Sequence, residues 1–505
     1  MKTPVPDHKK RSSKKRTQLV AGVLAAALPA TLATAMPLSA AADEVAPFDL
    51  VNQFIGTELD TSQNKSNDAY GNAFPGAAVP FGMVQSSPAT YKVGESNDLV
   101  REKGGYEYTA NQLRGFGLTR YEGSGCHVRF GGYEVPTIPY TGDLPSGALP
   151  VMPSSDIGHY YLDFDHENET SQPGYYSVTT DNGVSTELTA TERTAVSRFN
   201  FEEADGSTLI VNVSGQNNRS QGQHVTIDPE ANTVSGWMRG ADICDNGNYY
   251  TFYFSTTYDQ EFESYGVWNN GEMMAGEESA TLDSEGTGAD FRNRTGAWLT
   301  FADDATVTAR TGISYVSVAN AELNREAEAD DLSFDEVRAN ARASWEEALG
   351  TIEVTGGTEN DRVKFYSALY RSFLHPNLRN DVNGQYLGYD NEVHEVEEGR
   401  NFYKNFAGSG WDMYRSQAQL IALTYPEVAA DINQSIVALT EQTGSWAPGA
   451  ARMQGDSLQT IIATTDDMGI TNYDREAALQ SMIDTQQLPG DKSTRTDAYQ
   501  YFATA

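Results

Sequence analysis

The chain has 505 residues, which is enough for about two or three domains that each bury a hydrophobic core. Its formal net charge is −35 at pH 7. Such a charge opposes broad electrostatic attraction to nucleic acid and to anionic lipid, and it suits a protein that handles neutral ligands. We therefore expect no nucleic-acid partner.

Residues 1–42 have the pattern of a bacterial Sec-type signal peptide. A basic stretch from Lys9 to Arg16 precedes the apolar run Leu19–Leu28, and small residues follow. We expect cleavage near Ala41 or Ala42, with a signal anchor as the alternative because the apolar run continues without charge. No later segment is apolar enough to span a membrane. The sequence thus predicts a secreted protein with no membrane span after cleavage.

The chain has two cysteines, Cys126 and Cys244. In an oxidising compartment they could form a disulfide, and their spacing equally allows two separate buried thiols. Neither spacing nor neighbouring residues indicate a zinc site. We expect no metal ligands among the residues of this chain.

Residues 43–318 show the pattern of an antiparallel β-sandwich. Short alternating runs, such as 175–180 and 207–213, are separated by Gly, Asn, Asp and Pro. The run 249–257 is the richest in aromatic and β-branched residues. Core burial explains that composition.

Helical spacing begins after residue 318, so the sequence predicts an α+β multidomain protein. Residues 319–350 are expected to form a linker helix, and 351–505 a helical domain that opens with a short strand at 351–354. The end of the chain, 497–505, has the pattern of an amphipathic helix that is cut off. Further helices are expected at 361–374, 410–423, 426–443, 457–464 and 474–485.

Two glycine-rich motifs lie in the β region. The first comprises Val51–Thr57 and Gly71–Gln85 and includes Phe81 and Gly82. Taken alone, it is a rigid Pro/Gly-rich connection between strands. The second, Gly115–Cys126, combines glycines that supply positive φ with charged residues.

The third motif comprises Phe365–Pro376, Gly388–Asp390 and Trp411–Arg415. Taken alone, Trp411–Arg415 indicates a helix N-terminus with Asp412 near the dipole and an Asp412–Arg415 pair.

Together these motifs resemble glycoside hydrolase family 92. The resemblance implies a β-sandwich followed by an (α/α)6 barrel, and a calcium-dependent exo-α-mannosidase that inverts anomeric configuration on mannose-containing glycans, with α-1,2-linked mannose as the first expectation. It assigns mannose contact to Trp411 and Asp412. Their chemistry fits that assignment, because a carboxylate accepts hydrogen bonds from neighbouring hydroxyls and an indole covers the apolar face of a sugar. The residues that it places along the cleft are Phe81, Gly82, Arg120, Tyr121, Glu122, Gly125 and Cys126.

The sequence departs from the family at two places. Arg120-Tyr121-Glu122 replaces the usual His-Leu-Ser, which puts the usual leaving-group preference in doubt, and 448–452 lacks the usual Trp-Glu and Asn-Glu-Thr elements. These departures are consistent with an alternative function, a non-catalytic mannose-binding protein derived from such an enzyme.

The catalytic acid, the base and the calcium ligands of the family lie in later barrel elements. We find no match to those elements, so we expect an incomplete barrel, catalytic residues and calcium ligands beyond residue 505, and no activity from the 505 residues alone. Asp456, Asp466 and Asp467 are the nearest carboxylates and are interpreted as solvated helix residues. His375, before a proline, is interpreted as a structural histidine.

Overall fold

The computed structural model describes residues 45–58, 73–91, 105–120, 132–142, 144, 162–213, 220–241, 249–270, 272–283, 295–404, 410–444, 446 and 457–485. The predicted signal segment, both cysteines, residues 448–452 and the end of the chain lie outside these residues. Their predictions are therefore not tested.

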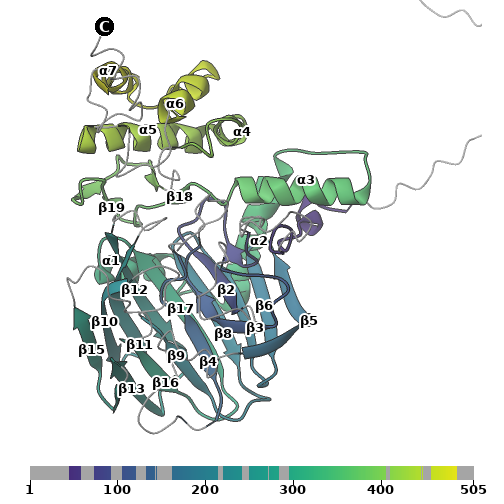
Figure 1. Ribbon diagram of the computed structural model, residues 1–505, viewed down its shortest axis with the longest axis vertical. Helices are drawn as coiled ribbons and strands as arrows, with labels where there is room; N and C mark the ends of the chain where they lie inside the picture. Colours follow the sequence, from purple (N-terminus) through teal and green to yellow (C-terminus); the bar gives the residue numbers. More distant parts are fainter. Residues whose placement is uncertain are drawn as a thin grey trace, which may run out of the picture. The chain divides into compact units, whose positions relative to one another are not determined.

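An antiparallel β domain occupies the first part of the described chain (Figure 1). Within the described residues, 17 strands form one hydrogen-bonded network. The strands are β1 (Ala77–Ala78), β2 (Gln85–Tyr91), β3 (Gln112–Gly117), β4 (Thr137–Tyr140), β5 (Leu162–Gln172), β6 (Tyr175–Thr180), β7 (Ser185–Ala190), β8 (Thr194–Asn200), β9 (Thr208–Val211), β10 (Ser220–Asp228), β11 (Thr233–Ala241), β12 (Tyr249–Tyr258), β13 (Ser264–Asn269), β14 (Glu272–Ala275), β15 (Ser279–Asp283), β16 (Thr295–Thr300) and β17 (Thr306–Ser314).

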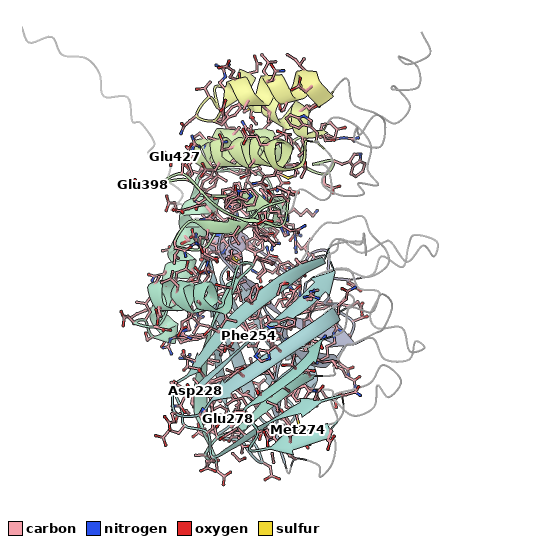
Figure 2. The ribbon with its side chains drawn as sticks, turned by 90° about the vertical axis from the view of Figure 1, so that its left-hand side faces the viewer. Asp228, Phe254, Met274, Glu278, Glu398 and Glu427 are labelled. Carbon is pink, nitrogen blue, oxygen red and sulfur yellow. The ribbon has the colours of Figure 1, made fainter. Side chains whose placement is uncertain are left out.

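Strand β12 shows why these residues form strands. It pairs with β11 on one side and with β17 on the other. Phe252 and Phe254 are fully buried, whereas the intervening Tyr253 is half-buried, as the period of two in a strand requires. Figure 2 shows Phe254 in this sheet and Glu398 and Glu427 in the segments that follow it. The strands predicted at 175–180 and 249–257 are confirmed.

Helices follow the β domain, and the N-termini of α2 and α3 are capped by side chains. Ser333 and Glu336 form a reciprocal capping box at the start of α2, and Thr358 and Asp361 form another at α3. The helices are η1 (Pro47–Leu50), α1 (Val318–Glu328), α2 (Phe334–Gly350), α3 (Glu359–Ser372), α4 (Gln417–Thr424), α5 (Pro426–Thr443), α6 (Ser457–Asp467) and α7 (Arg475–Thr485).

Two small strand pairings lie between α3 and α4, which the helical pattern did not predict. Strand β18 (Asn377–Leu378) pairs with β21 (Tyr403–Lys404), and β19 (Gln385–Leu387) pairs with β20 (Val393–Glu395). Their strands are too short for a period of two to be visible in the sequence.

Three local predictions differ from the structure. The strand expected at 351–354 is wrong, because these residues form a turn and irregular backbone. The expected linker 319–350 contains two helices, α1 and α2. Residues 411–416 form turns, so the helix expected from Gly410 begins only at Gln417. The two-layer sandwich and the (α/α)6 arrangement stay predictions.

None of the described helices combines the length and the apolar composition that a membrane crossing requires.

Helix α2 docks on the β domain through a tryptophan. Trp345 is fully buried, and its indole nitrogen donates a hydrogen bond to the carbonyl of Ala78 at 2.6 Å. Its ring packs against Tyr370 of α3, with 4.4 Å between ring centroids. One side chain therefore joins β1, α2 and α3.

We expect Trp345→Phe to lower the free energy of unfolding by about 2–3 kcal/mol, because it leaves a small cavity and an unpaired buried carbonyl. Urea unfolding measures this loss. Leu323→Ala on the exposed face of α1 is the control and is expected to change stability by less than about 0.5 kcal/mol. Equal effects of the two substitutions would contradict the docking role.

Candidate functional site

The first sequence motif contacts helix α3, which belongs to the third motif. The backbone nitrogen of Asn52 donates to the Ser367 hydroxyl at 2.9 Å, and the side-chain amide of Gln53 donates to the Tyr370 hydroxyl at 2.6 Å. Arg371 donates back to the carbonyl of Gln53 at 2.8 Å. Residues more than 300 positions apart in the chain are thereby held together.

The second part of the first motif forms a backbone junction with the end of α3. The Phe81 nitrogen donates to the Phe373 carbonyl at 2.7 Å, and the Leu378 nitrogen donates to the Phe81 carbonyl at 2.8 Å. The side-chain amide of Asn377 donates to the Gly82 carbonyl at 2.8 Å. We call these residues the Phe81 junction.

Phe81 is buried within an aromatic cluster. Its ring centroid lies 5.7 Å from that of Phe373 and 5.4 Å from that of Tyr425. Its φ of 57° is unusual for a residue with a side chain, and the two junction hydrogen bonds offset that strain. Phe81 and Gly82 were expected beside a cleft; in the structure, Phe81 is a core residue.

Trp411 and Asp412 lie in the turns that lead into α4. Gln417, the first residue of that helix, donates its side-chain amide to the carbonyls of Ser372 and His375, at 2.9 and 2.8 Å. The segment that carries Trp411 and Asp412 is therefore tied to the Phe81 junction. This role of Gln417 was not predicted, since a polar residue at a helix start carries no distinguishing signal in the sequence.

The start of this turn depends on a glycine. Gly410 has φ 72°, and its carbonyl accepts the backbone hydrogen bonds of Met413 and Tyr414. A Cβ at this position would lie 2.7 Å from a methyl carbon of Leu458 and 3.0 Å from one of Ile461. The turn thus needs glycine for its backbone conformation and for its packing against α6.

The Trp411 indole and the Asp412 carboxylate are accessible to a ligand. Trp411 is 40% exposed, which is unusual for a large aromatic side chain. Asp412 is exposed as a residue, yet surrounding protein desolvates its carboxyl group enough to raise its pKa. It has no ion-pair or hydrogen-bond partner among the residues that the structure describes. Its oxygens are free to accept hydrogen bonds from a ligand.

The alternative interpretation, in which Asp412 lies at a helix N-terminus and pairs with Arg415, is not supported. Arg415 instead donates to the Tyr414 hydroxyl at 2.9 Å, and its guanidinium carbon lies 5.7 Å from the centre of the Trp411 ring. A cation near the ring helps to orient the indole.

Arg120 was expected to line the cleft, and the structure buries it. Its guanidinium donates to the carbonyls of Ser87 and Pro88 on β2, at 3.1 and 2.6 Å. Tyr121, Glu122, Gly125 and Cys126 lie outside the described residues. Of these five cleft candidates, only Arg120 is described, and its guanidinium donates hydrogen bonds to β2.

The remaining candidates have structural roles. Asp466 accepts hydrogen bonds from Arg475 and from the Tyr473 hydroxyl, and the Arg475 hydrogen bond holds its pKa below the usual value. Desolvation lowers the pKa of His375 to about 4, and its ring contacts the Asn377 side chain at 2.7 Å. Asp456 lies outside the described residues.

We expect Gly410→Ala to destabilise the protein more than Gly444→Ala does. Gly444 ends α5 with φ 66°, and a Cβ at this position would have no atom within 4 Å, so alanine there costs about 1 kcal/mol of backbone strain. Gly410→Ala adds a steric clash of roughly 1–3 kcal/mol. Urea unfolding compares the two variants; equal losses would show that the Leu458 contact is unimportant.

Comparison with known proteins identifies the family. Residues 50–314 match the glycosyl hydrolase family 92 N-terminal domain, and residues 320–504 match the family 92 catalytic domain. A protein of Arthroderma benhamiae described as an uncharacterized secreted glycosidase is 27% identical over 322 residues, which is 61% of this chain and 40% of that protein.

Solved structures of family 92 enzymes are also similar to this chain. A family 92 α-mannosidase from Bacteroides thetaiotaomicron is 26% identical with a TM-score of 0.75, over 88% of this chain and 57% of that one. A family 92 inverting mannosidase from the same organism is 28% identical with a TM-score of 0.74, over 91% and 58%. The chain spans a little over half the length of these structures. On the two matching domains, the chain belongs to glycoside hydrolase family 92.

Proposed function

We propose that this protein acts in the hydrolysis of terminal α-linked mannose from glycans, with inversion and with α-1,2 linkages as the first candidates. The observation that carries the proposal is the adjacent pair of an exposed indole, Trp411, and an unpaired carboxylate, Asp412, on a turn that the family motifs hold in place. A related Bacteroides α-mannosidase has been solved with mannoimidazole, which supports mannose as the sugar.

The two side chains would divide the binding of one mannose residue. The indole of Trp411 provides an apolar face for the C–H groups of the ring, and the carboxylate of Asp412 accepts hydrogen bonds from two neighbouring hydroxyls. Gln417 positions both by fixing the start of α4 to the end of α3. These residues bind and orient the sugar, and we assign no catalytic acid or base among the described residues.

Inverting hydrolysis needs an acid and a base whose carboxyl groups lie about 6.5–9.5 Å apart. Asp466 is one of the carboxylates considered from the sequence. It accepts a hydrogen bond from Arg475 at 2.7 Å, which makes it unsuited to either role. Calcium, expected from the family, prefers several oxygen ligands. No group of three or more acidic, His or Cys side chains suited to a metal ion occurs among the described residues, so these residues do not fit a calcium site.

We also propose that the protein is secreted, as residues 1–42 predict. The description of the Arthroderma protein as a secreted glycosidase supports this.

We expect Asp412→Asn to weaken mannoimidazole binding by about 10- to 100-fold, because a charged acceptor of sugar hydroxyls is lost. Trp411→Ala is expected to weaken it by a similar factor. Isothermal titration calorimetry measures both, with Asp467→Asn, an exposed carboxylate on α6, as the matched control.

Wild-type affinity in both site variants would show that mannose binds elsewhere. Binding that depends on Asp412, without any turnover of an aryl α-mannoside, would instead favour the non-catalytic mannose-binding protein.

Mannoimidazole binding should also weaken on acidification. The ionised Asp412 carboxylate accepts charge-assisted hydrogen bonds that are stronger than those of the protonated acid, and desolvation raises its pKa above the ordinary value of 3.8. Protonation therefore begins at a higher pH than for a solvated aspartate, and affinity falls as the pH drops through the raised pKa. Titrations between pH 7 and pH 4 test this. Because mannoimidazole itself titrates, the ratio of wild-type to Asp412→Asn affinity is the informative quantity, and a constant ratio would contradict the assignment.

A further inference from the structure

Two buried arginines flank one tyrosine in the β domain. The guanidinium carbons of Arg114 and Arg120 lie 4.4 and 4.8 Å from the centre of the Tyr133 ring. Strand β3 makes room for this ring with two glycines: a Cβ on Gly117 would lie 2.5 Å from it, and one on Gly115 would lie 3.1 Å from its hydroxyl. The Gly-Phe-Gly sequence thus creates the slot in which the ring lies between β3 and β4.

Arg120 is 2% exposed, and much of its hydrogen-bonding capacity is unused. Its Nη2 atom donates to the carbonyls of Ser87 and Pro88, whereas Nε and Nη1 are buried without a hydrogen-bond partner in the part of the chain that the structure describes. Burial lowers the pKa of Arg120 to about 9, so the side chain stays charged at neutral pH. A buried charge with unused N–H groups is costly unless an anion meets it.

The neighbouring carboxylate, Glu134, attracts the Arg120 guanidinium electrostatically and also has neutral hydrogen-bond donors. It accepts hydrogen bonds from the Gly132 nitrogen at 3.2 Å and from the hydroxyls of Thr119 and Tyr250. Its flanking residues, Tyr133 and Val135, both have positive φ. Such backbone is held in place only where surrounding contacts over-determine it, and it is concentrated at ligand sites.

This cluster lies next to the Phe81 junction. Leu118, two residues before Arg120, accepts a backbone hydrogen bond from Gln85, whose side chain donates to the Leu374 carbonyl at 3.0 Å. On the other side, Tyr250 packs against Tyr315, with 5.7 Å between ring centroids. The arginines are therefore at the edge of the β domain that contacts the end of α3.

We propose that Arg120, oriented by Tyr133, is the anchor of an anion-binding site for a phosphate or carboxylate group. Nε and Nη1 each keep N–H groups that can donate to an oxygen of such an anion, and the guanidinium supplies the positive charge. The site does not depend on the mannose assignment. It explains why a strongly acidic protein buries a guanidinium whose remaining N–H groups are unused.

The test is a thermal-unfolding titration of the full chain with inorganic phosphate, with acetate as a second arm and sodium chloride at matched ionic strength as the reference. We expect a saturable rise in Tm with phosphate or acetate that chloride does not produce. A response to phosphate alone assigns phosphate groups, and a response to both assigns carboxylates as well.

Three variants separate ligand binding from a structural role. Arg120→Met should abolish the anion-dependent rise, because it removes the positive charge and all the N–H donors. Arg120→Lys should weaken anion binding at least about tenfold, since a compact ammonium does not reproduce the fixed N–H directions of a guanidinium. Arg198→Met, which removes an arginine paired with Glu187 at 2.6 Å, should keep the rise.

A wild-type Tm that does not respond to either anion up to about 10 mM would overturn the proposal, because a site of useful affinity would be saturated. An unchanged anion response in Arg120→Lys or Arg120→Met would also overturn it. If Arg120→Met does not fold, the wild-type titration and Arg120→Lys decide.

Discussion

The backbone pairing of Phe81 with Phe373 and Leu378 is the interaction on which the described structure most depends. It joins the β domain to the helical part with main-chain hydrogen bonds of 2.7 and 2.8 Å, which no side-chain substitution removes directly. The Phe81 ring then continues the connection into the aromatic cluster with Tyr425. One continuous apolar core consequently extends from Phe48 in the first helix, η1, to Ala478 in α7.

The same junction explains how the proposed sugar-binding turn can hold its side chains in fixed positions without being part of a helix or a strand. Trp411 and Asp412 lie in turns, which are mobile in general unless they are tied down. Here Gly410 fits closely against α6, and Gln417 is hydrogen-bonded to the end of α3. Trp411 and Asp412 are thereby held by a rigid scaffold while their own surfaces stay accessible.

Buried charges near the junction differ in how they are satisfied. Asp381 accepts hydrogen bonds of 2.7 Å from Asn320 and Asn324, and Arg193 pairs with Glu328 at 2.7 Å. These groups hold α1 against β17 and the segment after α3, and their hydrogen bonds offset the cost of burial. Arg120 is buried to a similar extent and lacks such partners on two of its nitrogens among the described residues. This contrast is the basis of the proposal that Arg120 anchors an anion site.

Local periodicity determined the strand β12, the helices α2 and α5 and the change from β to helical structure, because burial on one face imposes a period of two or 3.6 on the sequence. The Trp411-Asp412 pair was proposed as a sugar site because its motif resembles that of family 92. Only the tertiary structure decided that Phe81 is a core residue, that Gln417 fixes the turn and that Arg120 is enclosed. Those properties arise from contacts between residues tens to hundreds of positions apart, and such contacts leave no periodic trace in the sequence.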